Sequence, residues 1–265
     1  MIHLRTIGIE PPETSGFPFE IPALTDFAVE IERPVTFLVG ENGSGKSTLL
    51  EGLACATRTI GVGAHPVDRD PTLDAVRPLA AALRLSWNRP VHRGFFMRAE
   101  DFFGFVNRVK SEQATFEREA ARVRAENRDM APGDLARMLG PHTGSAHQLR
   151  ERYGDDIDAR SHGEQFLAFF RSRIVPGGLY LLDEPEVALS PTSQLAFLSL
   201  LLQAVGDDDC QFIIATHSPM LMAFPDAAIL DFDHPPVRRI PYEEVEHVKL
   251  TREFLDSPGR FLRHL

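Results

Sequence analysis

The chain has 265 residues, of which 43% are hydrophobic, so it can bury a full core, and we expect one large α/β domain over 1–265. Its 28 Lys and Arg against 38 Asp and Glu give a net charge of −10, which opposes generic adhesion to nucleic acids or acidic membranes. Only Cys55 and Cys210 are present, which suits a reducing compartment better than a disulfide framework.

The sequence shows no sign of export or of membrane insertion. Its N-terminus lacks the apolar core of a signal peptide, and no run of about 18 apolar residues, enough to span a bilayer, occurs. Together with the cysteine usage, this predicts a cytoplasmic protein with no membrane insertion. If it serves a membrane process, another protein is expected to supply the membrane part.

The N-terminal region predicts strands that lead into a glycine-rich loop. Alternating apolar residues indicate strands over 2–9 and 27–31, and a short buried strand follows over 35–39. Residues 46–57 have helical composition, so a strand, a loop and a helix succeed one another. Further strands are predicted over 83–87, 95–97, 179–182, 211–215 and 228–232.

The loop between the third strand and the first helix predicts a phosphate site. Its glycines allow the backbone to curl, so that N–H groups point inward at the positive end of the following helix. Lys46 is expected to reach the β- and γ-phosphates, Ser47 to bind Mg²⁺, and Thr48 to donate near the α-phosphate. A chance glycine-rich turn is the alternative, against which the flanking strand and helix weigh. The candidate nucleotide-binding residues here are Gly40, Asn42, Gly43, Ser44, Gly45, Lys46, Ser47 and Thr48.

Two later strands end in polar residues at the edge of the sheet where the loop also opens. The first ends in Asp183 and Glu184. Asp183 is expected to hold Mg²⁺ through its water shell, and Glu184 to polarise the attacking water. His217 follows the next strand and is expected to donate a hydrogen bond to a γ-phosphate. The alternatives are a strand that ends in a polar turn and a lone loop histidine.

These motifs resemble those of the ATP-binding-cassette (ABC) ATPases, and in particular the RecF- and SMC-like branch and compact ATPases related to it. The resemblance covers most of the chain. In that superfamily a Ser-Gly signature opens a helix and meets the γ-phosphate of a partner subunit. Residues 161–165, Ser-His-Gly-Glu-Gln, are similar to it, with His in place of the usual second-position Gly. The resemblance implies ATP and Mg²⁺ as cofactors, with Ser161 and Gly163 facing the other subunit of an ATP-dependent homodimer. The alternative is an ordinary helix cap.

Two positions depart from the family pattern. Where the family has a Mg²⁺-sensing Gln, this chain has residues 95–100, and Glu100 as a metal ligand or Arg98 is the candidate substitute. Glu100 could equally begin an exposed helix. Ser190 stands where the loop after the acids normally carries Asp. The candidates for adenine stacking, which are also core candidates, are Phe17, Phe19 and Phe27.

The remaining pattern predicts the architecture around the site. Apolar strands separated by helical segments indicate a largely parallel sheet covered on both faces. The charged stretch 111–129, free of Gly and Pro, predicts an exposed helix. The fold class expected is α/β with a P-loop NTPase fold, an antiparallel N-terminal β portion, a helical insertion over roughly 100–160 and a C-terminal tail over 237–265.

The expected function is Mg²⁺-dependent ATP binding and hydrolysis that drives ATP-sandwich dimerisation, in DNA repair, chromosome or defence processes. The alternatives are a nucleotide-binding subunit of an ABC transporter and a nucleotide-gated binding switch with slow turnover. An unidentified protein partner is a further candidate. DNA is a candidate partner because two arginine clusters could contact phosphates, although solvated faces would look the same. The clusters are Arg84, Arg89, Arg93 and Arg98, and Arg118, Arg122, Arg124 and Arg128.

Overall fold

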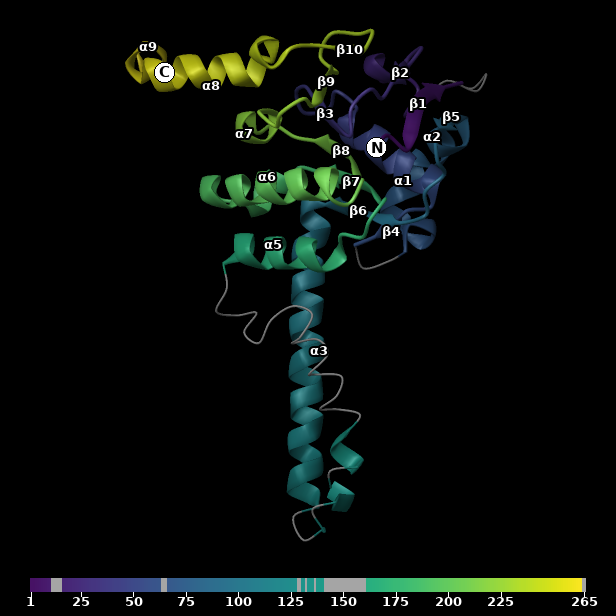
Figure 1. Cartoon of the computed structure of the whole chain (residues 1–265), viewed down its shortest axis with the longest axis vertical. Helices are drawn as coiled ribbons and strands as arrows, with labels where there is room; N and C mark the ends of the chain where they lie inside the picture. The colour runs from purple at the N-terminus through teal and green to yellow at the C-terminus, as the bar shows by residue number, and fades with distance from the viewer. Residues whose placement is uncertain are drawn as a thin grey trace.

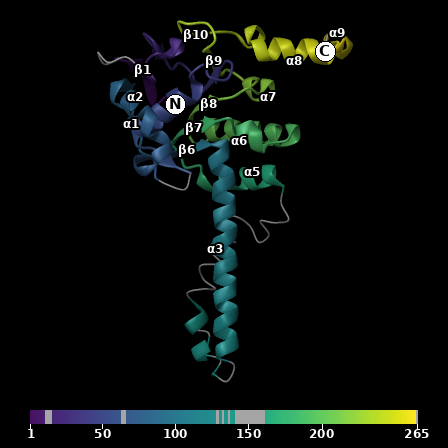
Figure 2. The same ribbon diagram turned by 180° about the vertical axis from the view of Figure 1, so that it is seen from behind.

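The structure is a computed structural model that describes residues 1–10, 16–62, 66–127, 130–131, 133–135, 137–140 and 161–263. The chain folds into a head built around a β-sheet, from which one long helix projects (Figures 1 and 2). No helix in these described ranges is long and apolar enough to cross a bilayer.

A seven-stranded sheet in the order β10-β9-β3-β8-β7-β6-β4 forms the centre of the head. All neighbouring strands run parallel except the edge pair β9 and β10, which is antiparallel. The central strands are buried along their whole length because helices cover both faces, which explains their continuous apolar runs. The bounds are β3 Val35–Val39, β4 Ile60–Gly61, β6 Gly94–Arg98, β7 Leu179–Asp183, β8 Gln211–Ala215, β9 Ala228–Asp231 and β10 Arg238–Arg239.

A second, antiparallel sheet has the order β2-β1-β5, with β1 Leu4–Ile9, β2 Ala28–Glu30 and β5 Leu83–Trp87. Gln211, the first residue of β8, connects the two sheets. Its side-chain amide accepts hydrogen bonds from the N–H groups of His3 and Leu4, at 2.9 and 2.8 Å, and donates to the Leu4 carbonyl at 2.9 Å. The predicted antiparallel N-terminal portion and the largely parallel main sheet are both confirmed.

The helices cover the two faces of the main sheet with separate hydrophobic clusters. On one face, Leu49 and Leu53 of α1 pack with Leu38 of β3 and with residues of α2 and β1. On the other face, Phe170 of α5 and Phe197 of α6 pack with neighbouring aromatic residues of the strands. The helices are α1 Lys46–Thr57, α2 Arg77–Ala82, α3 Ala99–Glu126, α5 His162–Arg173, α6 Pro191–Gly206, α7 Pro219–Met222, α8 Glu246–Asp256 and α9 Pro258–Leu262. The short 3₁₀ helices are η1 Pro22–Leu24, η2 Val67–Arg69, η3 Pro71–Val76, η4 Pro185–Ala188 and η5 Tyr242–Glu244.

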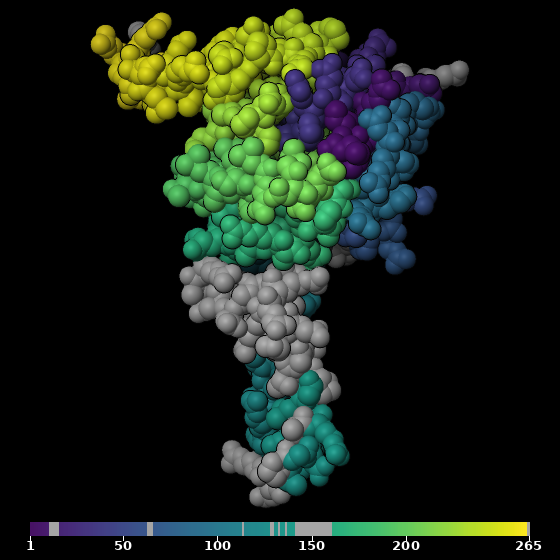
Figure 3. Space-filling model, in the orientation of Figure 1, coloured from purple at the N-terminus to yellow at the C-terminus, as the bar shows by residue number. Residues whose placement is uncertain are grey.

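Helix α3 leaves the head as a stalk, which the space-filling view shows below the packed body (Figure 3). Its 28 residues correspond to about 42 Å at 1.5 Å per residue. The helix begins at Ala99, earlier than the predicted 111, because Phe102, Val106 and Val109 form an apolar face that packs into the core before the exposed part begins. Residues 128–129, 132, 136 and 141–160 of the predicted insertion lie outside the described residues.

Candidate functional site

The glycine-rich loop joins β3 to α1 and requires glycine on steric grounds. Gly40, Gly43 and Gly45 have φ values of +145°, +83° and +104°, a region that other residues rarely adopt. A Cβ atom at Gly40 would lie 2.8 Å from Asp233 Oδ1, and one at Gly45 would lie 2.8 Å from Ile21 Cγ2. The predicted strand, loop and helix are therefore present, with a backbone that side chains would disrupt.

Lys46 is the first residue of α1, and only 4% of it is exposed. Its ammonium group donates hydrogen bonds to the carbonyls of Gly40 and Glu41, at 2.6 and 2.8 Å. Burial lowers the pKa of Lys46, while Asp233 and Glu184 act to raise it. The positive charge is thus held against its own loop, beside the N-terminus of the helix, where anions are favoured.

Ser47 and Asp183 lie together, although 136 positions separate them in sequence. The Ser47 hydroxyl donates to Asp183 Oδ1 at 3.1 Å. Asp183 ends the buried strand β7; burial raises its pKa to about 7, against the hydrogen bond from Ser47, which lowers it. Hydroxyl and carboxylate oxygens are the ligands that Mg²⁺ prefers, and a cation would favour the ionised form of this acid. The donor set fits the Mg²⁺ predicted from sequence.

Glu184 and His217 face each other at the same edge of the sheet. Glu184 has a left-handed backbone, with φ of 51° and ψ of 50°, and its N–H donates to the Ala215 carbonyl at 2.9 Å. Such a conformation costs a non-glycine residue about 1–3 kcal/mol and is concentrated at functional sites. Glu184 Oε1 lies 3.6 Å from His217 Nε2. Among the described residues, this buried nitrogen has no hydrogen-bond partner, so it can donate to a phosphate oxygen.

The strand register explains why these side chains meet. In the parallel sheet, Asp183 of β7 pairs with Ala215 of β8 on one side and with Arg98 of β6 on the other. The carboxyl ends of these strands therefore share one edge, next to the loop that follows β3. The structure brings together Lys46, Ser47, Asp183, Glu184 and His217, which the sequence placed in one site.

Arg98 and Glu100, the candidates for the missing Gln, occupy different environments. The Arg98 guanidinium is buried and contacts carboxylate oxygens of Asp101 at 2.7 Å, Glu51 at 3.2 Å and Asp70 at 3.4 Å. The Glu100 side chain is 77% exposed, in the first turn of α3, and lies 3.5 Å from Arg98 Nε. The role of Glu100 as a metal ligand therefore stays a prediction. The Arg98 guanidinium forms a buried ion-pair network.

Ser161 and Gly163 lie at the start of α5, as predicted. Ser161 caps the helix: its hydroxyl accepts from the N–H of Glu164, whose carboxylate accepts from the N–H of Ser161. A Cβ atom at Gly163 would lie 2.5 Å from Ser193 Oγ on α6, so this glycine permits close helix packing. Ser190 caps α6 by accepting from the N–H of Ser193 at 3.2 Å. The cap that competed with the signature interpretation is therefore present, and a role toward a partner subunit stays a prediction.

The three phenylalanines considered for adenine stacking differ in exposure. Phe27 is 3% exposed and its ring lies 6.0 Å from that of Phe232, centre to centre, so it belongs to the core. Phe17 is 57% exposed, and Phe19 is partly buried against the core. Phe17 is the candidate whose ring is most open to a ligand.

Sequence reasoning missed two residues that contact the site, Asp233 and His247. Asp233 Oδ1 accepts a hydrogen bond from the Glu41 N–H at 2.7 Å, which holds the start of the phosphate loop. His247 of α8 places Nε2 3.1 Å from Nδ1 of His217. Polar residues directly after the strand 228–231 were a usable signal for Asp233, whereas nothing local pointed to His247.

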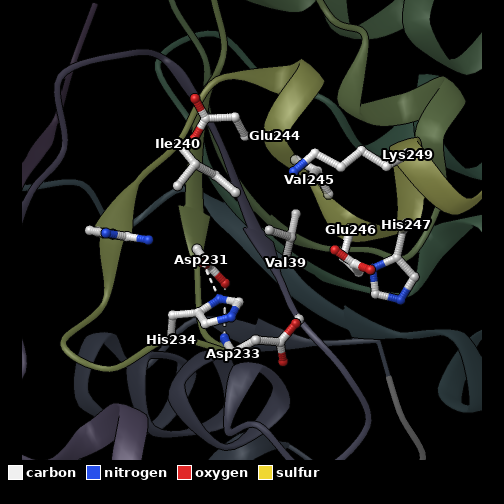
Figure 4. A pocket seen from close by; sticks show the side chains of 12 residues that line it. Val39, Asp231, Asp233, His234, Ile240, Glu244, Val245, Glu246, His247 and Lys249 are labelled. Carbon is white, nitrogen blue, oxygen red and sulfur yellow. Dashed lines mark hydrogen bonds and ion pairs between the residues drawn. The ribbon is translucent and has the colours of Figure 1, made fainter.

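A cavity of about 250 Å³ lies between the phosphate loop and the C-terminal segment, which here means residues 228–256 from β9 to the end of α8 (Figure 4). His234 Nδ1 lies 2.9 Å from Asp231 Oδ2 on one side, and the first turn of α8 lines the other. Its lining includes Val39, Gly40, Asp233, His247 and Lys249. The C-terminal segment thus contributes directly to the surroundings of the loop.

Comparison with known proteins places the chain among nucleotide-binding proteins. A family model described as "AAA domain, putative AbiEii toxin, Type IV TA system" matches residues 165–223, and a second one, "AAA domain", matches residues 19–60. The Macrolide export ATP-binding/permease protein MacB of Shewanella oneidensis is 29% identical over 202 residues, which are 75% of this chain and 28% of that protein. The Phosphonates import ATP-binding protein PhnC 2 of Albidiferax ferrireducens is 26% identical over 221 residues, 82% of this chain and 75% of that one.

These similarities support an ABC-type P-loop ATPase. The matched ranges contain the phosphate loop on one side and the acids and His217 on the other, which are the residues that the structure brings together. Members of this family hydrolyse ATP. The ATPase chain spans between 28% and 38% of the length of the MacB relatives that it matches. Among solved structures, cbiO1 from Clostridium perfringens, part of the ABC transporter complex cbiONQ, has a TM-score of 0.49 and 17% identity, covering 99% of this chain and 100% of that one.

Proposed function

We propose that this ATPase couples Mg²⁺-dependent ATP hydrolysis to the formation and release of an ATP-bound dimer. The observation that carries the proposal is the meeting of two pairs at one sheet edge. Ser47 lies 3.1 Å from Asp183, and Glu184 lies 3.6 Å from His217, beside the buried ammonium of Lys46. The site thus combines an anion cradle, oxygen ligands for a cation, a carboxylate and an imidazole, which are the groups that phosphoryl transfer to water requires.

Each side chain has a role that follows from its position. Lys46 and the loop N–H groups would hold the β- and γ-phosphates, and Ser47 and Asp183 would hold Mg²⁺. When bound, the cation would neutralise charge on the phosphate oxygens. The Glu184 carboxylate would orient the attacking water and accept its proton, and His217 Nε2–H would donate to the γ-phosphate.

The proposed dimer would complete each site with the start of α5 from the other copy. The Ser161 side of α5 is exposed, and the helix N-terminus presents backbone N–H groups next to a hydroxyl. These groups would meet the γ-phosphate held by Lys46 and Ser47 of the partner. The proposal accounts for a serine at position 161, where capping alone accepts several residue types.

Replacement of Glu184 by Gln tests the proposal. Steady-state phosphate release should fall about 10²–10⁴-fold, because the general base is lost, while ATP binding should persist. The variant should elute as a dimer with ATP and Mg²⁺ and as a monomer without them. Glu253→Gln, an exposed carboxyl on α8, is the control and should match the wild type. A Glu184→Gln protein that stays monomeric at saturating ATP would exclude the dimer cycle. Single-turnover hydrolysis by the wild type separates an enzyme from a slow nucleotide-gated switch.

The biological role divides into two candidates, and each has a supporting observation. The name of the longer family-model match includes a toxin of a toxin–antitoxin system, which favours a role in defence. The export and import proteins among the relatives favour a transporter subunit. We also propose a cytoplasmic location and leave an additional protein partner as a candidate.

DNA binding can be tested on the stalk helix. Arg98 is part of a buried ion-pair network and is therefore removed from the first arginine cluster. Of the second cluster, Arg128 lies outside the described residues, and Arg118, Arg122 and Arg124 are exposed on α3. Their joint replacement by Gln should weaken duplex DNA binding and reduce its salt dependence, by about 0.9 in the logarithmic slope for each lost phosphate contact. ATP turnover that ignores DNA, together with co-purification of a membrane permease, would instead support the transporter alternative.

A further inference from the structure

Helix α8 presents a second histidine to the imidazole of the proposed γ-phosphate contact. His217 Nδ1 and His247 Nε2 are 3.1 Å apart, and the two rings lie nearly edge to face, with centroids 4.9 Å apart and an interplanar angle of 73°. Both side chains are largely buried, at 26% and 20% exposed. The contact joins positions 30 residues apart. It is a hydrogen bond, and only one of the two nitrogens carries the proton that forms it.

The surroundings decide which nitrogen donates. If His247 donates, Nδ1 of His217 is the acceptor and the proton of neutral His217 lies on Nε2, facing Glu184 Oε1 at 3.6 Å. In the opposite arrangement, a bare Nε2 lone pair would face that carboxylate in a buried position, where such a repulsion is costly. The geometry therefore selects His247 as the donor and keeps the Nε2–H of His217 available.

We propose that His247 is a positioning residue that holds His217 in the Nε2–H tautomer needed to donate to the γ-phosphate. This inference rests on the proposed role of His217 and extends it to the C-terminal segment. His217 touches the nucleotide in the proposed reaction, whereas His247 acts through His217.

The rest of the contact set holds the pair in place. The His217 N–H donates to Glu186 Oε1 at 2.6 Å, which fixes its backbone. His247 Nε2 also lies 3.7 Å from Glu41 Oε1 of the phosphate loop. Val245 and Val248, which flank His247, are 1% and 3% exposed and anchor the start of α8 in the core. The imidazole of His247 is therefore presented from a rigid position, and the phosphate loop and the helix are connected through it.

The loss of the donor should separate turnover from binding. Without the His247 donor, only Glu184 still disfavours the Nδ1–H form of neutral His217, so a larger part of the population fails to donate to the γ-phosphate. Nucleotide affinity depends mainly on Lys46 and the phosphate loop, and a substitution of His247 on α8 leaves these residues unchanged. We expect His247→Ala to lower kcat about tenfold, the size of one lost hydrogen bond, with KM for ATP within about twofold of wild type.

A conservative variant distinguishes positioning from a structural role. Gln carries a side-chain N–H at about the place of imidazole Nε2, so His247→Gln should restore kcat to within about twofold of the wild type. Glu253→Ala, on the same helix and exposed, is the matched control and should leave kcat unchanged. If His247→Ala fails to fold in a thermal melt, His247→Asn, whose shorter amide does not reach His217, replaces it.

A direct readout is the tautomer of His217 in ¹⁵N-labelled protein without nucleotide. The wild type should show the Nε2–H form, and His247→Ala a mixture. Wild-type kcat in His247→Ala, equal losses in the Gln and Ala variants, or an Nδ1–H tautomer in the wild type would each overturn the proposal. If the wild type itself turned over no ATP, the proposed function would fail, while the tautomer measurement would still decide the role of His247.

Discussion

Replacement of Arg98 by Gln restores the residue type that ABC ATPases usually carry near this place, yet the structure predicts that it destabilises this protein. The Arg98 guanidinium, 9% exposed, contacts carboxylates of Asp70, Glu51 and Asp101 whose side chains are 10%, 18% and 17% exposed. Nη1 also donates to Thr72 Oγ1 at 3.1 Å. A neutral amide can satisfy at most part of this set, so nearly buried negative charges would lose their compensating cation.

The magnitude follows from the cost of breaking a buried ion pair by removing one partner, about 3–5 kcal/mol. This is a large share of a typical free energy of unfolding of about 5–15 kcal/mol. For a chain of this size it corresponds to a drop in melting temperature of roughly 6–20 °C. Arg69→Gln is the control, because Arg69 lies 3.8 Å from Asp68 with 81% and 71% of the two side chains exposed, and such pairs contribute little.

The loss of unfolding free energy caused by Arg98→Gln should depend on pH. Burial raises the pKa of Glu51, and Arg98 opposes that rise. Without Arg98 the pKa of Glu51 should rise further. At high pH the ionised Glu51 then destabilises the folded state, whereas at low pH the carboxyl is protonated and this cost disappears. Urea titrations should therefore show a larger loss at pH 8 than at pH 5. A variant within about 1 kcal/mol of the wild type, or an equal loss at both pH values, would refute the reasoning.

Three further substitutions test other parts of the structure. Burial raises the pKa of Asp183 to about 7, so ionisation of this carboxyl should destabilise the nucleotide-free protein as the pH rises. Asp183→Asn should therefore raise the melting temperature more at pH 8 than at pH 5, and it should abolish phosphate release. Gly94 has φ of +117°, and a Cβ there would lie 1.8 Å from the Leu179 carbonyl oxygen, so Gly94→Ala should cost about 4 kcal/mol or more in urea titration; an unchanged midpoint would contradict the β6–β7 register. Gly163→Ala should be relieved by Ser193→Ala, with a coupling energy of about 1 kcal/mol in a double-mutant cycle, and additive effects would argue against the close α5–α6 contact.

Most of the features that the sequence alone determined are encoded in short, continuous stretches of the chain. The strands predicted over 35–39 and 211–215 agree with the buried strands β3 and β8, because a buried strand needs an apolar run bounded by turn residues and both are local. The phosphate loop, 40–47, was equally readable, since its glycines, Lys46 and Ser47 lie within eight positions. Parallel strands then implied that Asp183 and His217 would reach the same edge.

Tertiary structure decided which polar residues face one another. Arg98 could have been a cation facing DNA or a substitute for the missing Gln, and only the approach of Asp70 and Glu51 makes it part of a buried network. His247 and Asp233 reach the site from the C-terminal segment, about 200 positions after the loop. Such contacts depend on how helices pack on the sheet, and the periodicity of a segment reports which of its faces is apolar but does not identify the residue that it meets.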